Sequence, residues 1–278
     1  MLGAWVDGSV AATIGIDDRG LHYGDGLFET IAASAGRPRF LAGHLARLAR
    51  GCAALSIPMP DEARLRAEVA QAAALAPHVI VKLIVTRGAA RARGYAIEGG
   101  EAPRRIVIAY AWLEGPDHAA APARVARAER PVARPPAALA GVKHLNRLEQ
   151  VLALTEARRR ALDEVLLCTD DDRIVGGSMT NLFLVTGGEL VTPPAASCLV
   201  AGVMRGEVLR AAARLGLAVA ERAISVADLS RVEGAWLTNA RVGLWPIGAI
   251  ADRSLAVHAW HSPLQRQVRQ AALGVQDA

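Results

Sequence analysis

Lysine is the residue type that this chain most clearly lacks. Its 278 residues include 32 basic side chains, yet only Lys82 and Lys143 are lysines. Arginine keeps its proton in proteins and cannot serve as an amine nucleophile. In a chain that uses arginine almost everywhere else, the two lysines are therefore the first candidates for chemistry that needs a neutral amine.

The sequence also lacks the features of several protein classes. No window approaches the roughly 18 consecutive apolar residues of a membrane span, and the first residues do not form a signal-peptide pattern. The net charge is +5, but the arginines are scattered among acidic residues with few aromatic neighbours, which indicates solvated helix faces and no nucleic-acid surface. The cysteines are far apart and have no histidine at metal-ligand spacing, so we expect buried thiols in a reducing cytoplasm and no metal site: Cys52, Cys168 and Cys198.

The length and the alternation of elements predict an α/β protein of two domains. The stretch GPDHAAAPA has the glycine, proline and small residues that are typical of an interdomain linker. We therefore expect an N-terminal domain over residues 1–114, a linker over 115–123 and a C-terminal domain over 124–278.

The predicted elements follow ordinary start and stop signals. An acidic first turn and Pro77 delimit a helix over residues 61–76. The apolar spacing of Leu145, Leu148, Val151 and Leu152 predicts a helix from about His144. Further helices are expected over 44–55, after Gly202 and from about Pro263. Strands are expected over 4–6, 27–32, 79–86, 105–112, 123–129, 164–168, 182–185, 190–191, 217–221 and 235–238.

The surroundings of the two lysines differ. Lys82 lies in HVIVKLIVTRG, a run of β-branched residues that predicts a strand, so its stem is expected to pack along its neighbours. Lys143 follows a stretch rich in proline and alanine and stands beside His144 and Asn146, just ahead of a predicted helix. That position lets a side chain reach into a cleft, which makes Lys143 the stronger candidate.

Four further segments are candidates for a binding site. The glycines of residues 20–30 allow a tight backbone path beside a ligand, and Arg47 lies among apolar neighbours, where it needs an anionic partner. Residues 201–209 place a glycine at a helix start whose free N–H groups suit a phosphate. Residues 176–185 form a turn of small residues that leads into a strand. Each segment alone also fits ordinary hairpins, solvated arginines or a helix start without a ligand.

Together with Lys143, these segments have the order and spacing of one family. The sequence resembles the fold-type IV pyridoxal-phosphate enzymes, which include branched-chain and D-amino-acid aminotransferases, and within them the aminodeoxychorismate lyases. The resemblance spans nearly the whole chain and rests on DRGLHYGDGLFET (18–30), FLAGHLARL (40–48), TRGAARARGY (86–95), LAGVKHLNRLEQVLA (139–153), MTNLFLV (179–185), AGVMRGEVL (201–209) and WLTNARVGLWPI (236–247). It implies a two-domain α/β (α+β) fold with pyridoxal 5'-phosphate at the domain interface, a small-molecule substrate and a homodimer.

The resemblance also implies roles for individual residues. Lys143 would bind the cofactor's aldehyde covalently and then act as the proton-transfer base, with Thr30 helping to handle the proton. One side chain and several backbone groups would bind the cofactor's phosphate: Arg47, Val203, Met204, Asn239 and Ala240. Arg93 and Tyr95 would bind carboxylates of the substrate.

One position departs from the family pattern. A glutamate normally stands five residues before the asparagine of MTNLFLV and binds the cofactor's pyridine nitrogen, but this chain has Gly176 there. A water or another side chain replaces the carboxylate, the enzyme works with a weaker electron sink, or activity is lost. The implied reaction converts 4-amino-4-deoxychorismate to 4-aminobenzoate and pyruvate, and the gain of an aromatic ring helps it to tolerate a weak sink. An aminotransferase of branched-chain or D-amino acids and a cofactor-binding protein with weak catalysis remain open.

Overall fold

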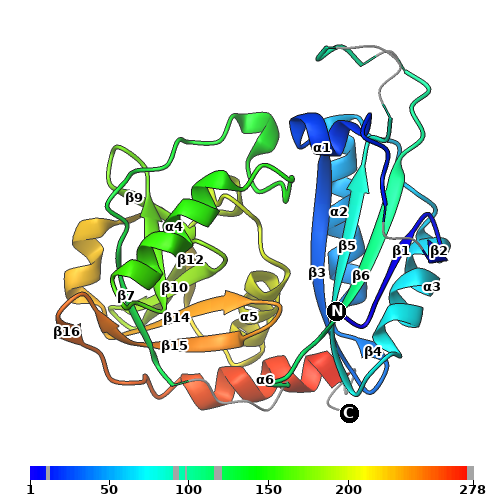
Figure 1. Cartoon of the computed structure of the whole chain (residues 1–278). Helices are drawn as coiled ribbons and strands as arrows, with labels where there is room; N and C mark the ends of the chain where they lie inside the picture. Colours follow the sequence, from blue (N-terminus) through cyan, green and yellow to red (C-terminus); the bar gives the residue numbers. More distant parts are fainter. Residues whose placement is uncertain (11–12, 90–93, 98, 116–120, 274–278) are drawn as a thin grey trace. The chain divides into compact units, whose positions relative to one another are not determined.

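The computed structural model describes residues 1–10, 13–89, 94–97, 99–115 and 121–273 (Figure 1). It is a mixed α/β protein with two sheets, as expected. Its internal contacts divide the chain into two units, Met1–His118 with Val142–Asn146, and Ala119–Gly141 with Arg147–Ala278. The division expected from the sequence places Val142–Asn146, which includes Lys143, in the second domain, whereas their contacts lie in the first unit.

The first unit is an antiparallel sheet with helices on one face. Its strand order is β2 (Ser9–Val10), β1 (Gly3–Val6), β6 (Arg104–Ala111), β5 (His78–Thr86), β3 (Gly26–Ser34) and β4 (Arg37–Pro38). The alternating residues Leu27, Ile31, Val81 and Leu83 are buried in one core with side chains of α2 (Leu41–Leu55) and α3 (Glu62–Ala73). Because side chains alternate along a strand, their neighbours Phe28, Thr30 and Lys82 lie on the face that these helices leave uncovered.

The second unit is built on a larger mixed sheet. The strand order is β12 (Val219–Glu221), β11 (Glu189–Thr192), β10 (Asn181–Thr186), β14 (Gly234–Asn239), β15 (Gly243–Ile250), β7 (Ala123–Arg127), β8 (Glu164–Cys168), β9 (Arg173–Gly177) and β13 (Ile224–Ser225), with β16 (Arg253–Ser254) beside β15. Helix α4 (Leu148–Arg159) packs on β8, while α5 (Val203–Arg214) and α6 (His261–Leu273) pack on each other and on β15. The buried residues on β8, β10 and β14 form the centre of this core.

Two sequence-based expectations are wrong. The helix expected from about His144 begins at Leu148, because residues 143–145 extend along β3 and bond to its backbone. Gly176 and Gly177 belong to β9 and not to a turn of small residues, since both pair with β8. Six strands were not predicted. Four of them are only two residues long, and the other two, β9 and the long β15, contain the Gly-Gly pair, Pro246 and Gly248, which are untypical of strand interiors.

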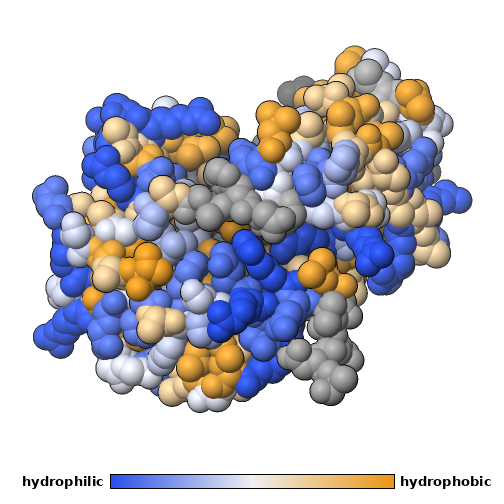
Figure 2. All heavy atoms as spheres, turned by 90° about the horizontal axis from the view of Figure 1, so that it is seen from below, coloured by the Kyte–Doolittle hydropathy of each residue, from blue (hydrophilic) through white to orange (hydrophobic). Residues whose placement is uncertain are grey.

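Helix length, candidate metal ligands and cysteine pairing can be read within the described residues. No helix among them is both long and apolar enough to cross a membrane, and no group of three or more His, Cys, Asp or Glu within them is placed to hold a metal ion. All three cysteines are buried and unpaired, as expected, and burial raises the pKa of Cys52 to about 11. On the face shown in Figure 2, hydrophilic residues are interspersed with small separate hydrophobic groups.

Candidate functional site

Lys143 lies in an extended segment that is added to an edge of β3. The backbone N–H of Phe28 donates to the carbonyl of Lys143 at 3.0 Å, and the N–H of Leu145 donates to the carbonyl of Gly26 at 3.0 Å. Gly26 permits this approach, because a Cβ there would lie 2.8 Å from a methyl carbon of Leu145. Main-chain bonds to the strand, and not a helix, therefore fix the position of the lysine.

Both lysines of the chain place their side-chain nitrogen over the ring of Phe28. Nζ of Lys143 is 4.2 Å and Nζ of Lys82 is 5.4 Å from the ring centroid. Thr30 and Lys82 are direct cross-strand neighbours on β3 and β5. All four side chains are half-buried, so a small molecule can reach them. The structure thus brings together the two predicted catalytic residues, Lys143 and Thr30, and adds Lys82.

Lys82, which the sequence analysis names as the weaker of the two lysine candidates, lies in the same group of side chains. The pattern of β-branched residues correctly predicts its strand, but it does not indicate which side chain of the next strand it meets. The scarcity of lysine in the sequence is the signal that points to Lys82, because the argument from scarcity applies equally to both lysines.

Arg47, the predicted phosphate-binding side chain, pairs with Glu29 on the helix-covered face of β3. Its Nε donates to the Glu29 carboxylate at 2.8 Å and its Nη2 donates to the other oxygen, while Nδ1 of His44 lies 2.7 Å from that oxygen. Burial by itself would raise the pKa of Glu29, but the charge and hydrogen bonds of Arg47, with the hydrogen bond of His44, lower it to about 2. This buried pair joins β3 to α2, and the phosphate contact of Arg47 stays a prediction.

The predicted carboxylate-binding residues lie on the chain after β5. Arg93 falls outside the described residues. The Tyr95 side chain is 84% exposed, and its ring lies against that of Tyr23 with 5.2 Å between the centroids. The phenol is therefore accessible to a solute, and its role in binding carboxylates stays a prediction.

In the second unit, the predicted phosphate-binding backbone groups lie at the start of α5. Val203 and Met204 are the first residues of this helix, and N–H groups in a first helical turn have no partner within the helix. Gly202 precedes them, and no side chain caps the helix there. A Cβ on Gly202 would overlap the side-chain oxygen of Asn181, whose amide group donates to the carbonyl of Val200 at 2.9 Å. The arrangement leaves the first turn able to bind an anion.

Asn239 and Ala240 begin the turn between β14 and β15. The side-chain oxygen of Asn239 accepts hydrogen bonds from the N–H groups of Arg241 and Val242, both at 2.9 Å. Its amide group donates to the carbonyl of Met179 at 3.4 Å. The Asn239 side chain is thus used to hold the turn, so the predicted ligand contact falls to the backbone.

Two buried hydroxyl groups of the second unit have no hydrogen-bond partner among the described residues. They belong to Ser178, just after β9, and Thr238, which precedes Asn239. Buried hydroxyls normally have a partner, so these two are suited to polar atoms of a ligand. With the uncapped start of α5, they make the second unit fit a phosphorylated cofactor better than an apolar ligand.

The backbone at Gly176 does not suit the glutamate of the family pattern. Its φ is +138°, a conformation that residues with a side chain rarely adopt. A Cβ there would also lie 2.8 Å from the carbonyl oxygen of Thr180. A carboxylate cannot be restored at this position without moving the backbone, so the loss of the glutamate is built into the local fold.

A buried carboxylate on the neighbouring strand does not replace it. Glu164 of β8 is fully buried, and a Cβ on Gly177 would lie 2.8 Å from its Oε2. It accepts four hydrogen bonds, from the N–H groups of Val165, Ser178 and Met179 and the hydroxyl of Thr180. Four donors match the capacity of a carboxylate, so Glu164 fixes the turn before β10.

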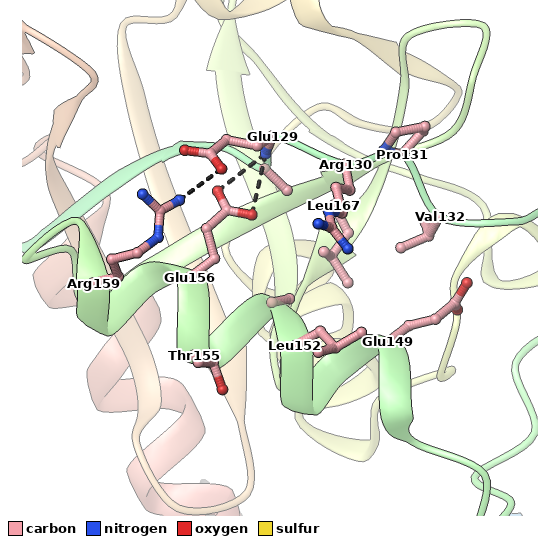
Figure 3. A pocket seen from close by; sticks show the side chains of 12 residues that line it. Glu129, Arg130, Pro131, Val132, Glu149, Leu152, Thr155, Glu156, Arg159 and Leu167 are labelled. Carbon is pink, nitrogen blue, oxygen red and sulfur yellow. Dashed lines mark hydrogen bonds and ion pairs between the residues drawn. The ribbon is translucent and has the colours of Figure 1, made fainter.

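A separate cavity of about 290 Å³ lies in the second unit, between α4 and the chain after β7 (Figure 3). The Glu129 carboxylate accepts a hydrogen bond from Arg159 at 2.6 Å, and the backbone N–H of Glu129 donates to the Glu156 carboxylate at 3.0 Å. None of the predicted site residues lines this cavity. Because these polar groups already bond to one another, we do not regard this cavity as the candidate ligand site.

Comparisons with known proteins agree over most of the chain. The sequence matches the family described as amino-transferase class IV over residues 26–250. Aminodeoxychorismate lyase of Vibrio harveyi is 30% identical over 252 residues, which cover 89% of this chain and 91% of the relative. The bifunctional aminodeoxychorismate lyase / D-amino acid transaminase of Mycobacterium tuberculosis is 27% identical over 250 residues, with 80% and 81% covered. The crystal structure of 4-amino-4-deoxychorismate lyase from Pseudomonas aeruginosa has a TM-score of 0.86 and 42% identity, with 96% and 98% covered.

Proposed function

Because the chain belongs to the class IV aminotransferase family, whose cofactor is pyridoxal 5'-phosphate, we propose that it is a lyase that converts 4-amino-4-deoxychorismate to 4-aminobenzoate and pyruvate, a step toward folate. The observation that carries this proposal is the 42% identity to a lyase of that specificity over 96% of the chain. The arrangement of Lys143, Thr30 and Lys82 around Phe28 supports it, because this reaction needs both a base and positive charge.

Each unit by itself carries residues that are suited to bind a part of the cofactor. Lys143 supplies the amine for covalent attachment to the cofactor's aldehyde. The phosphate would be bound by the backbone of the first turn of α5 and of the β14–β15 turn, with Arg47 supplying positive charge. The unpaired hydroxyls of Ser178 and Thr238 are further donors for its polar atoms.

Lys143 and Thr30 provide the proton transfers. When bound, pyridoxal phosphate withdraws electrons from the substrate carbon that bears the amine, which makes the proton on that carbon acidic. Nζ of Lys143 takes up this proton, the bond from the ring to the enolpyruvyl oxygen breaks, and the ring becomes aromatic. The hydroxyl of Thr30 relays a proton to the departing enolpyruvate, which becomes pyruvate. The two products together contain every atom of the substrate.

Lys82 supports this chemistry through its charge. Its side-chain nitrogen lies over the same ring as that of Lys143. The substrate also carries two carboxylates, so a fixed cation beside the reacting amine is suited to bind one of them. Arg93 and Tyr95 are the proposed partners of the other.

Gly176 favours the lyase reaction over transamination. Without a carboxylate at the pyridine nitrogen, the electron sink is weaker. Formation of an aromatic ring drives the lyase reaction forward, whereas reversible transamination has no such driving force. The resemblance to a bifunctional lyase and D-amino acid transaminase keeps aminotransfer as the second candidate, and a cofactor-binding protein with weak catalysis is the third.

Product analysis distinguishes the three candidates. The purified protein, loaded with pyridoxal phosphate, is incubated with 4-amino-4-deoxychorismate and no keto acid. A lyase releases equal amounts of 4-aminobenzoate and pyruvate. If nothing is released but a branched-chain or D-amino acid and a keto acid exchange their amino group, the chain is an aminotransferase. If neither reaction occurs although absorbance shows bound cofactor, the chain is a weakly catalytic binding protein.

We further propose that the protein is a homodimer. Leu148, Val151 and Leu152 form an apolar stripe on the outer face of α4 and are 77%, 58% and 59% exposed, whereas the small side chains Ala153 and Ala157 face the core. Apolar patches of this kind commonly mark protein contacts. Sedimentation at micromolar concentration should show a dimer, and Leu152→Glu should shift it toward the monomer; a monomeric wild-type protein would refute the proposal.

A further inference from the structure

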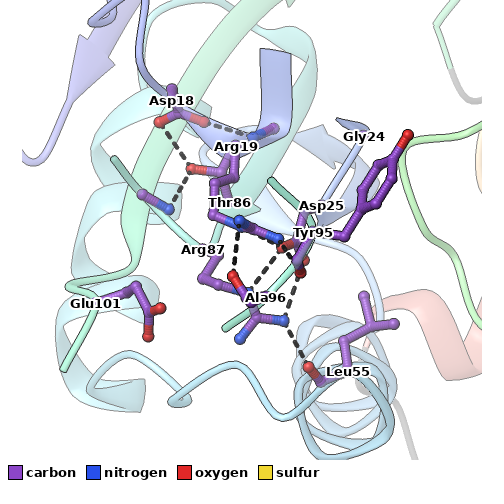
Figure 4. A network of polar contacts seen from close by, with 12 residues as sticks. Asp18, Arg19, Gly24, Asp25, Leu55, Thr86, Arg87, Tyr95, Ala96 and Glu101 are labelled. Carbon is purple, nitrogen blue, oxygen red and sulfur yellow. Dashed lines mark hydrogen bonds and ion pairs between the residues drawn. The ribbon is translucent and has the colours of Figure 1, made fainter. Parts of the chain in front are cut away.

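In the first unit, the side chain of Arg19 donates hydrogen bonds to three consecutive backbone carbonyl groups. Nη1 of Arg19 donates to the carbonyls of Gly94 at 3.1 Å and Ala96 at 3.3 Å, and its Nη2 donates to that of Tyr95 at 3.1 Å (Figure 4). The Arg19 residue is only 5% exposed, so these bonds are shielded from water. An exposed stretch of chain is thereby held in one conformation by a buried cation.

The same guanidinium is fixed from its other side by Asp25. Nε of Arg19 donates to Asp25 at 2.8 Å, and Nε of Arg87 donates to the same oxygen at 2.7 Å. Arg87 in turn donates to the carbonyls of Leu55 at 2.6 Å and Ser56 at 2.8 Å, at the end of α2. Arg19 is therefore held by a network that reaches into the core, as Figure 4 shows.

This network is continuous with the edge that carries Lys143. Asp25 is flanked by Gly24 and Gly26, and the carbonyl of Gly24 accepts from the side chain of Asn146 at 3.3 Å. The carbonyl of Gly26 accepts from the N–H of Leu145. One short stretch, residues 24–26, thus contacts both the arginine that holds Tyr95 and the segment that presents the lysine.

The side chain of Tyr95 is placed by these contacts and not by burial. Its ring extends away from the guanidinium groups (Figure 4) and lies against Tyr23, over whose ring the Arg19 guanidinium carbon stands at 5.0 Å. Without the three carbonyl bonds, the exposed chain would have to be ordered each time a substrate binds, at a cost in conformational entropy.

We propose that Arg19 is a positioning residue that holds the Tyr95 segment ready to bind a carboxylate of the substrate, in fixed relation to the Lys143 edge. This inference rests on the proposed function for its substrate. Lysine cannot take over the role, because an ammonium lacks the planar fork that serves three carbonyls and Asp25 at once. Arg19 thus affects substrate binding without touching the reacting atoms.

The test compares Arg19→Gln and Arg19→Lys with Arg66→Gln, an exposed arginine paired with Glu62 on α3. For the loaded enzyme, Arg19→Gln should raise KM for 4-amino-4-deoxychorismate at least about tenfold, while kcat stays within about threefold. Arg19→Lys should give an intermediate KM, because it keeps the charge beside Asp25. Arg66→Gln should leave both constants unchanged.

A second readout is independent of activity. Chymotrypsin cuts after exposed tyrosines in mobile chain, so cleavage after Tyr95 should be at least about tenfold faster in Arg19→Gln than in the wild type or Arg66→Gln. If Arg19→Gln does not fold, Arg19→Lys takes its place in both measurements. Unchanged cleavage, or a fall in kcat at unchanged KM, would overturn the proposal. If the wild type releases no 4-aminobenzoate, the proposed function fails, and the cleavage rates alone decide whether Arg19 orders the segment.

Discussion

Two regions of the first unit bring an ammonium group to the same ring, and they do so from different backbones. Lys82 stands in the middle of β5, which is hydrogen-bonded to a strand on each side. Lys143 stands in an extended segment that is bonded to β3 near the start of that strand. The comparison separates the two lysines by their backbone: the first stands in a strand that is paired on both sides, and the second in a segment added at an edge. The proposed function assigns them different tasks accordingly, a fixed charge to Lys82 and a reactive amine to Lys143.

The largest expected effect separates the two lysines by activity. Lys143→Arg keeps the charge but removes the amine proposed as the base, so turnover should fall on the order of 10³-fold. Lys82→Arg keeps a cation over Phe28 and should retain most of the turnover. Release of 4-aminobenzoate by both variants measures this difference. Equal losses in the two variants would show that the tasks are not divided in this way.

The next effect concerns the opposite face of β3, where the buried pair of Glu29 and Arg47 joins this strand to α2. Because the pKa of Glu29 is about 2 in the folded protein and 4.5 in its ordinary state, its contribution to stability is complete above about pH 4.5 and is lost as the pH falls toward 2. This contribution is on the order of 3 kcal/mol. The free energy of unfolding in urea, measured from pH 5 to 2.5, should fall less steeply in Glu29→Gln than in the wild type.

The exposed Glu62 provides the control for this measurement. Glu62→Gln removes a carboxylate that pairs with Arg66 on the surface of α3, and such pairs contribute little. Its acid profile should match that of the wild type. If Glu29→Gln also matches the wild type, the buried pair does not stabilise β3 as described.

A smaller effect tests Lys82 as a fixed charge. Lys82→Met keeps the apolar stem of the side chain but removes the ammonium, so KM for the substrate should rise about tenfold, or about 1.4 kcal/mol, with a smaller change in kcat. Steady-state kinetics at neutral pH check this. A lower kcat at unchanged KM would assign Lys82 to the chemistry of the reaction and weaken the contrast with Lys143.

The smallest effect concerns the shared ring. Phe28→Leu removes the aromatic face from both ammonium groups while keeping an apolar side chain on β3. A cation over an aromatic ring is stabilised by about 0.5–1 kcal/mol at exposed sites, so kcat/KM should change by only a few-fold. Kinetics of Phe28→Leu beside Phe28→Tyr, which keeps a ring, isolate this contribution. A loss of 100-fold or more in Phe28→Leu would mean that the ring itself, and not the lysines, controls the site.

The sequence predicted the elements whose periodicity is strong. The alternation in residues 79–86 and the apolar spacing in 44–55 match β5 and α2 closely. The helix expected from His144 begins later, because backbone bonds between residues 143–145 and β3 compete with helix formation, and such long-range pairing leaves no local pattern. The spacing of Leu148, Val151 and Leu152 likewise predicts a helix, but local spacing does not show which face of that helix is buried, and these three side chains are exposed.

The candidate site could be predicted in part. The scarcity of lysine and the neighbours of Lys143 single out that residue, whose role as the reactive amine stays a prediction, whereas the place of Lys82 depends on the register of β3 and β5. The pairing of Arg47 with Glu29 was anticipated only as a need for an anionic partner. The strain at Gly176 could not be seen either, because φ and the closeness of the Thr180 carbonyl are properties of the folded backbone.

The division of roles between the two lysines is tested most directly by locating the covalent bond to the cofactor. Borohydride reduction of the protein loaded with pyridoxal phosphate makes this bond permanent, and peptide mapping by mass spectrometry then identifies the labelled lysine. The label should be on Lys143, in the peptide that contains HLNR, and Lys143→Arg should carry none. Label on Lys82 in the wild-type protein would contradict the account.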